Sequence, residues 1–393
     1  DNKDVDQRSK MIAWNFLYAE NLAPHHKKMA GEHAITILSQ VDRKKDVHSY
    51  IIGLRCLAII KGSSFSNDLI SRLDDDDARL RNGVRLLLEK VNDPQLEKKV
   101  IEKFSVSSAR AQAQFLQLFA VRGFLTAALI EQALASENEE LVETALNLSH
   151  VIFSVDTHTT KDPAVNTVLT TLLARLMKVP KHSKITEAWR RIPARYSASL
   201  LADAYVNSQT SSAKCALLEV IKSKKGVGLE KIALQGTLDA DENVNKAAFE
   251  ALAVLALAGQ SGNFIEMMHL NPKDGVIKGY QRALITASQD NLDVVSATLV
   301  AAINGNTSKV NLALIECLSG VGGKTAFKTL KKLIGSRSAI ISIEAYGALA
   351  NWSSFTEVYE LITLYSEAEG ESQKLLIRGV TAMIVKSSAG QSE

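Results

Sequence analysis

The sequence predicts an all-α fold, an α-solenoid in which antiparallel helix pairs stack into a right-handed superhelix. The chain has 393 residues but only 6 prolines and 6% aromatic residues, too little proline for a turn-rich all-β protein. Its length exceeds what one hydrophobic core usually fills, a limit that a repeat stack avoids because each unit packs only on its neighbours. An apolar pattern recurs every 31 to 35 residues in the C-terminal half, as expected of helical repeats.

The recurring pattern begins at an apolar residue that opens the first helix of each expected pair. These opening residues are Ala213, Val244, Val276, Val310, Ile341 and Leu376. Apolar or small residues stand four, seven and eight positions later, so that the four positions fall within about a 100° arc of one helix face. The small residues at the seventh position should be buried where neighbouring repeats meet. They include Ala251, Ala283, Cys317 and Ala348.

Turns and links between the expected helices carry their own signals. Glycines in 226–228 and 320–323 are expected to end the first helix of a pair, because glycine readily adopts a left-handed cap. The link 238–243 before Val244 is acidic, and its Asp and Asn side chains are expected to cap the next helix.

The N-terminal half shows the same pattern less regularly. Acidic links precede apolar helices near 73–88 and 134–146, whereas the polar stretch 156–163 and the prolines of 180–193 interrupt the series. The sequence therefore predicts two parts, irregular helical repeats over 1–205 and a regular repeat array over 206–393.

Residues 238–248 resemble HEAT repeats, in particular the short HEAT-like type of phycobilisome-lyase-type proteins, with Asn245 where that family usually has Arg. Residues 344–352, followed by 361–365 and 376–380, resemble repeat segments of secreted bacterial proteins linked to 3-keto-disaccharide hydrolase-type domains. The resemblance covers 205–393 and implies a HEAT-like, armadillo-like fold. It also implies a periplasmic or secreted bacterial location, with a cytoplasmic location as the alternative.

The chain begins at Asp1 without a methionine, which indicates that a leading segment was removed by signal-peptide cleavage or by the choice of expressed residues. The sequence has no apolar run long enough to span a bilayer, so we expect no membrane span.

Several short patterns resemble ligand sites but lack a required residue. Asp239 and Asp241 begin a calcium-loop pattern in which Val244 replaces the obligatory glycine, and we interpret them as helix caps. Residues 322–325 resemble the end of a phosphate-binding loop, but Leu318 stands where its first glycine is required. Histidines 25, 26 and 33 are spaced unlike helical metal ligands, and the three cysteines form no pair. We expect no cofactor, no metal and no catalytic site.

The leading functional hypothesis is a non-catalytic scaffold that presents a concave helical-repeat surface to a protein partner. The candidate partner-binding residues are Trp352, Phe355 and Tyr359, aromatic residues near one helix start. Trp352 has a second interpretation, in which it only fastens the turn between two helices.

One alternative is a nucleic-acid-binding repeat protein, which would use basic side chains. Its candidate residues are Lys222, Lys224, Lys225, Lys324, Lys328, Lys331 and Lys332. The net charge of +3 gives this alternative little support, because acidic links offset the lysines. The other alternative, an accessory module of a secreted carbohydrate-active protein, is implied by the resemblance alone.

Overall fold

The computed structural model describes residues 31–153, 163–180, 183–225, 228–352 and 355–389, except 33 and 37. Within these ranges the chain forms 21 α-helices and no strand, which confirms the predicted all-α fold. The histidines at 25, 26 and 33 lie outside the described residues.

The chain divides into two compact units, residues 1–196 and 197–393. The α-helices that begin in the first unit are α3 (Val47–Lys61), α4 (Ser66–Ser71), α5 (Ala78–Leu88), α6 (Leu96–Phe104), α7 (Ala109–Arg122), α8 (Ala127–Leu134), α9 (Glu139–Leu148), α10 (Pro163–Lys178), α11 (Ser183–Arg191) and α12 (Ala194–Asn207). Short 3₁₀ helices are η1 (Gly62–Phe65), η2 (Arg72–Asp74) and η3 (Ser149–Phe153). The predicted contrast in regularity between 1–205 and 206–393 stays a prediction.

The second unit continues with the same kind of element. Its α-helices are α13 (Ser211–Ile221), α14 (Glu230–Gly236), α15 (Glu242–Leu255), α16 (Ser261–Leu270), α17 (Asp274–Ser288), α18 (Leu292–Ala302), α19 (Lys309–Val321), α20 (Gly323–Ile334), α21 (Ala339–Ala350), α22 (Val358–Glu367) and α23 (Gly370–Ala389). The 3₁₀ helices are η4 (Ala258–Gln260) and η5 (Phe355–Glu357).

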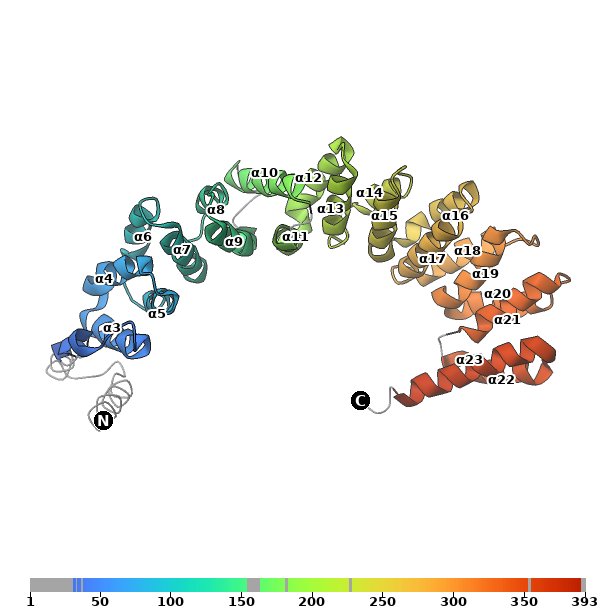
Figure 1. Cartoon of the computed structure of the whole chain (residues 1–393). Helices are drawn as coiled ribbons and strands as arrows, with labels where there is room; N and C mark the ends of the chain where they lie inside the picture. Colours follow the sequence, from blue (N-terminus) through green and yellow to red (C-terminus); the bar gives the residue numbers. More distant parts are fainter. Residues whose placement is uncertain are drawn as a thin grey trace. The chain divides into compact units, whose positions relative to one another are not determined.

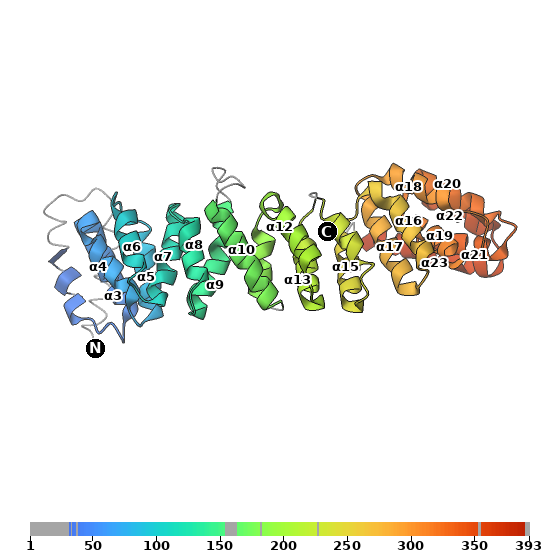
Figure 2. The same ribbon diagram turned by 90° about the horizontal axis from the view of Figure 1, so that it is seen from above.

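Each unit consists of two rows of helices (Figure 1). In the first unit one row consists of α3, α5, α7, α9 and α11, which pack one on the next. The second row lies against the first and consists of α4, α6, α8 and α10. In the second unit α13, α15, α17, α19, α21 and α23 form the corresponding row, which we call the odd row. The remaining helices α14, α16, α18, α20 and α22 form the even row. Seen from above, the pairs follow one another in chain order within each unit (Figure 2), so each repeat is stabilised by its neighbours.

The repeat positions predicted from the sequence form the core of the second unit. The residues four, seven and eight positions after each opening residue are buried in every odd-row helix from α13 to α21. Ala251, Ala283, Cys317 and Ala348 are at most 1% exposed, as predicted. Val276 is an exception, because it is only half-buried and its neighbour Ile277 enters the core instead. Ile384 on α23 is 49% exposed, and no helix in the described part of the chain packs beyond it.

Small residues let adjacent odd-row helices approach closely. A Cβ atom added to Gly279 on α17 would lie 2.3 Å from the ring of Phe249 on α15, and one added to Gly320 on α19 would lie 2.5 Å from Ile285 on α17. The Cys317 thiol lies 3.8 Å from the Gln281 carbonyl oxygen, to which it donates. These contacts join each repeat to the one before it.

Caps and glycine turns fix where the helices begin and end. The Asp241 carboxylate accepts the backbone N–H groups of Asn243 and Val244 at 2.9 and 3.2 Å, which confirms the capping interpretation for Asp241, whereas Asp239 pairs with Lys214 and does not cap the helix. Gly228 and Gly322 have φ of 81° and 78°, a region that favours glycine. Gly322 has ψ of −166°, so it turns the chain between α19 and α20 without forming the left-handed helical cap that was expected.

The acidic loop 74–77 of the first unit caps one helix and connects three repeats. Asp77 caps α5, and its hydrogen bonds from Arg79 lower its pKa to about 2. Asp75 pairs with Arg43 at 2.6 Å, and Asp76 pairs with Arg110 at 2.9 Å. The loop therefore reaches both the preceding and the following repeat.

Candidate partner-binding surface

The three aromatic residues predicted near α22 occupy different environments. Trp352 is 3% exposed, its ring meets Phe327 of α20 edge to face at 5.2 Å, and its Nε1 donates to Glu357 at 3.1 Å. Tyr359 on α22 is 81% exposed. Phe355 begins η5, and its side chain lies outside the described residues. Of the two side chains described, Trp352 fastens the turn to α20 and Tyr359 is free to meet a partner.

The lysines at the end of α13 do not form one exposed patch. Lys222 lies 3.9 Å from Glu219 and 3.8 Å from Glu250 of the next repeat. Lys224 is 3% exposed, and burial lowers its pKa to about 8. Lys225 is exposed. Part of the predicted charge is thus paired or removed from the surface.

The lysines of α20 form a separate exposed group. Lys324, Lys328, Lys331 and Lys332 are all exposed, and Lys331 pairs with Glu360 of α22 at 3.2 Å. The group lies in the even row, whereas Lys222 and Lys225 follow an odd-row helix, and α14 to α19 stand between them (Figure 1). The structure therefore does not join the two basic clusters into one surface.

The residues that resemble ligand patterns have structural partners. Asp239 pairs with Lys214 of the preceding repeat at 2.7 Å, and Asp241 caps α15. Across the described ranges no group of three or more His, Cys, Asp or Glu residues is arranged to hold a metal ion. None of the helices described is both long and apolar enough to cross a membrane.

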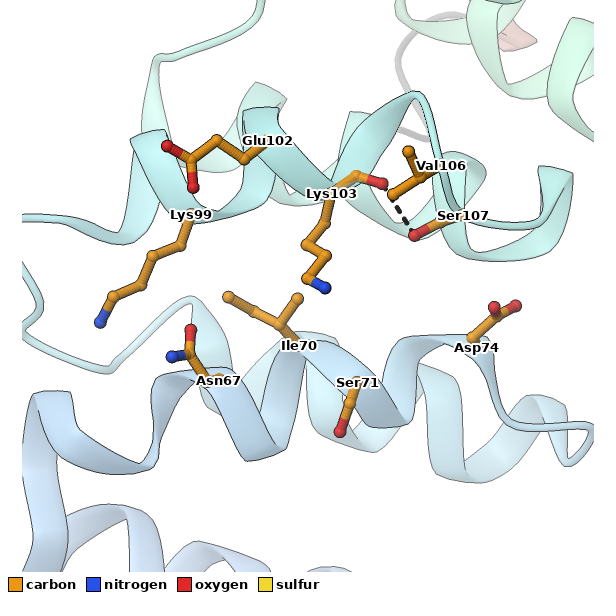
Figure 3. Close-up of a pocket in the computed structure, with 9 residues that line it drawn as sticks. All are labelled: Asn67, Ile70, Ser71, Asp74, Lys99, Glu102, Lys103, Val106 and Ser107. Atoms are coloured by element: carbon orange, nitrogen blue, oxygen red, sulfur yellow. Dashed lines mark hydrogen bonds between the residues drawn. The ribbon is translucent and has the colours of Figure 1, made fainter.

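A pocket of about 580 Å³ lies between α4 and α6 of the first unit. Figure 3 shows the Lys103 side chain reaching from α6 toward Ile70 and Ser71 of α4. The lining residues are Asn67, Ile70, Ser71, Asp74, Lys99, Glu102, Lys103, Val106 and Ser107. Lys99 pairs with Asp93 at 2.7 Å. Two lysines and two carboxylates balance in this lining, so the pocket favours neither an anion nor a cation.

A more informative surface is the side of the odd row that faces away from the core, which we call the free face. It is formed by the repeat positions one before, two after and six after each opening residue, because these project opposite the buried arc. On α15 and α17 the latter two positions hold charged, exposed side chains. They are Lys246, Glu250, Lys278 and Arg282.

The same positions on α21 hold apolar or small residues. Ile340 is 55% exposed, Ile343 is 50% exposed, and Gly347 has nothing within 4 Å of where a Cβ would be. The neighbouring helices are mixed at these positions, which hold Lys309, Leu312 and Glu316 on α19 and Leu375, Arg378 and Ala382 on α23. The free face thus changes from charged on α15 and α17 to aliphatic on α21. Single exposed aliphatic residues are common on proteins, but a cluster in register marks an interaction surface.

Two carboxylates border the aliphatic part of the free face. Glu316 of α19 accepts a hydrogen bond from the Gln281 side chain at 2.9 Å. Burial, and the nearby Glu316 carboxylate, raise the pKa of Glu344 on α21. Among the described residues neither carboxylate lies within ion-pair distance of a cation. No sequence pattern indicates this pair, because the two residues are 28 positions apart and occupy different repeat positions.

Comparison with known proteins supports the fold. No family profile matches the chain, and no curated protein matches it. Among solved structures, a mutant of Kap121p is similar with a TM-score of 0.51 and 13% identity, over 92% of this chain and 45% of that one. The karyopherin Kap121p bound to the extreme C-terminus of the protein phosphatase Cdc14p is similar with a TM-score of 0.51 and 12% identity, over 92% of this chain and 46% of that one.

The chain therefore spans less than half the length of these structures. At such low identity the similarity shows the fold alone, which is a HEAT-like α-solenoid, as predicted. The predicted links to phycobilisome-lyase-type proteins and to 3-keto-disaccharide hydrolase-type domains stay predictions.

Proposed function

We propose that the chain is a non-catalytic scaffold that binds a protein partner through the aliphatic part of the free face, which lies on α21 in the second unit. The observation that carries this proposal is the exposure of Ile340 and Ile343 on α21, where Ile343 occupies the position at which α15 and α17 expose Lys246 and Lys278. Burying exposed aliphatic area on association is favourable by roughly 25 cal/mol per Å². A surface that keeps such residues exposed in register is best explained by a partner that covers them.

The fold gives independent support to protein binding as the function. Kap121p, which is similar in fold, is bound in one structure to the extreme C-terminus of Cdc14p. Helical-repeat stacks offer extended concave surfaces of this kind, lined by one helix of each pair. We propose the odd row as that lining, and a periplasmic or secreted bacterial location on the resemblance of residues 344–352.

Site-specific photo-crosslinking tests the proposal. A benzophenone amino acid placed at Ile343 should yield a discrete protein adduct in an extract of the source organism. The same amino acid at Lys278 tests the matched position on α17, and at Lys328 it tests the exposed face of α20. The adduct should resist nuclease. The protein identified from the adduct, produced recombinantly, should bind the Ile343→Ser variant more weakly than the unchanged chain.

The proposal is wrong if position 343 gives no adduct, or if all three positions give the same adducts with equal yield. A nuclease-sensitive adduct confined to position 328 would instead support nucleic acid as the ligand of the α20 lysines.

A further inference from the structure

We infer that the partner presents an amphipathic helix with a lysine or arginine beside its apolar stripe, and that this helix packs along α21. The inference rests on the proposed function, since it specifies the partner of the same free face. Three observations support it: the shape of the exposed apolar stripe on α21 (Ile340, Ile343 and Gly347), the acidic border of that stripe, and the charges around it.

The shape of the exposed stripe suits a helix. Ile340, Ile343 and Gly347 follow one another at intervals of three and four residues, so they form a ridge along α21 with a gap at the glycine. Helices pack by placing such ridges into the grooves of a partner helix, and helix-in-groove recognition uses anchors at this spacing. The open space at Gly347 permits a large partner side chain to approach the α21 backbone.

The charge beside the stripe is negative on the α19 side. Glu316 of α19 and Glu344 of α21 lie there, near enough for the Glu316 carboxylate to raise the pKa of Glu344, and the Gln281 amide donates to Glu316 at 2.9 Å. Covering this edge with an uncharged partner would remove two carboxylates from water without compensation. An acidic partner would add repulsion, whereas a cation would pair with both carboxylates.

The surrounding cations do not already serve this role. Lys309 on α19 pairs with Asp274 of the preceding repeat at 2.5 Å. Arg282 occupies the matching position one repeat earlier, on α17, and Arg378 lies on α23, on the other side of the stripe. The α23 side would therefore accept an acidic or neutral edge of the partner helix. The basic edge of that helix would lie on the α19 side.

Three synthetic peptides of about two heptads test this chemistry on the whole chain. The first carries a leucine stripe with lysines, the second has the same stripe with glutamates, and the third has the composition of the first in an order without a stripe. Each is labelled with fluorescein, and binding is followed by fluorescence anisotropy at about 0.15 M salt. We expect the first peptide to bind at least about tenfold more tightly than the other two, a difference of about 1.4 kcal/mol.

Variants of the free face assign the binding to α21. Ile343→Ser should weaken binding of the lysine peptide about tenfold, and Lys278→Ser, at the same repeat position on α17, should leave it unchanged. The double variant Glu316→Gln, Glu344→Gln should reduce the preference for the lysine peptide over the glutamate peptide. All four side chains are exposed or half-buried, so circular dichroism should show an intact fold in each variant.

Equal binding of the lysine and glutamate peptides, or equal losses in Ile343→Ser and Lys278→Ser, would overturn the inference. If the crosslink at 343 forms but the lysine peptide does not bind, the partner has other chemistry and the proposed function stands. If the crosslink is absent as well, the proposed function itself fails.

Discussion

Polar side chains inside the stack act as fasteners between neighbouring segments. Thr237 and Tyr280 share a buried hydrogen bond of 2.7 Å, which joins the end of α14 to α17. Asn311 donates to the carbonyl oxygens of Asn304 and Asn306 at 2.9 and 2.7 Å and so holds the loop before α19. The side-chain polar atoms of these three residues are satisfied, which matters because an unsatisfied partner costs about 1–3 kcal/mol.

Trp352 tests the difference between a fastening residue and a binding residue. Trp352→Ala should lower the free energy of unfolding by about 3–5 kcal/mol, because a buried ring is replaced by a cavity. Tyr359→Ala serves as the control, since its side chain is 81% exposed and surface changes usually stay within about 0.5 kcal/mol. Urea denaturation measures both. An unchanged midpoint for Trp352→Ala would contradict the fastening role.

The buried Lys224 leads to a prediction with a defined pH dependence. Its pKa is lowered to about 8 in the folded chain from 10.5, so the unfolded chain binds more protons between these values. Below pH 8 the buried lysine therefore lowers the free energy of unfolding by its full amount. This loss disappears as the pH rises toward 10.5. Lys224→Met should raise the free energy of unfolding by roughly 1–3 kcal/mol at pH 7.

The gain should shrink near pH 10 in urea denaturation series recorded at both pH values. Lys225→Met is the matched control, because that side chain is exposed and should change stability little at either pH. A gain of equal size at both pH values would show that packing, not the charge, determines the effect.

At the scale of helices, periodicity predicts the buried side better than the exposed side. The positions around Val244 and Ile341 follow from the repeat spacing because every odd-row helix must bury the same arc. Val276 departs from this, since its bulky aliphatic neighbour Ile277 is buried in its place while the rest of the arc stays buried. The free face could not be predicted, because Glu316 and Glu344 become neighbours only through the packing of α19 against α21.

The close contact between α15 and α17 gives a test at this scale. Gly279→Ala should lower the free energy of unfolding by about 1–3 kcal/mol. Its Cβ would lie 2.3 Å from the Phe249 ring, which itself meets Tyr280 edge to face at 5.0 Å. Gly347→Ala, in open space on α21, should instead be stabilising by up to about 1 kcal/mol, because alanine favours helix. Thermal and urea denaturation compare the two, and a loss of equal size in both would contradict the packing argument.

At the scale of the whole molecule, the stack has contacts that run mainly between successive repeats. A structure of this kind has a stability that is close to a sum of repeat and interface terms. The 31 to 35 residue spacing was sufficient to predict this architecture. The prolines and polar stretches of the N-terminal half predicted a boundary after residue 205, and the two compact units divide after residue 196, within α12.

Such a stack should respond to damage locally, which hydrogen exchange can measure. Loosening one interface lowers the cost of opening the two repeats that share it, and the effect fades along the row because distant repeats share no contact with them. In Gly279→Ala we expect faster amide exchange in α15 and α17, a smaller increase in α19, and none in α3 to α9. The whole chain is labelled with deuterium and then digested with pepsin, and mass spectrometry of the peptides follows every segment in one sample. Gly347→Ala provides the control, with unchanged or slower exchange in α21. A uniform increase across both units would instead mean that the chain opens as a single cooperative body.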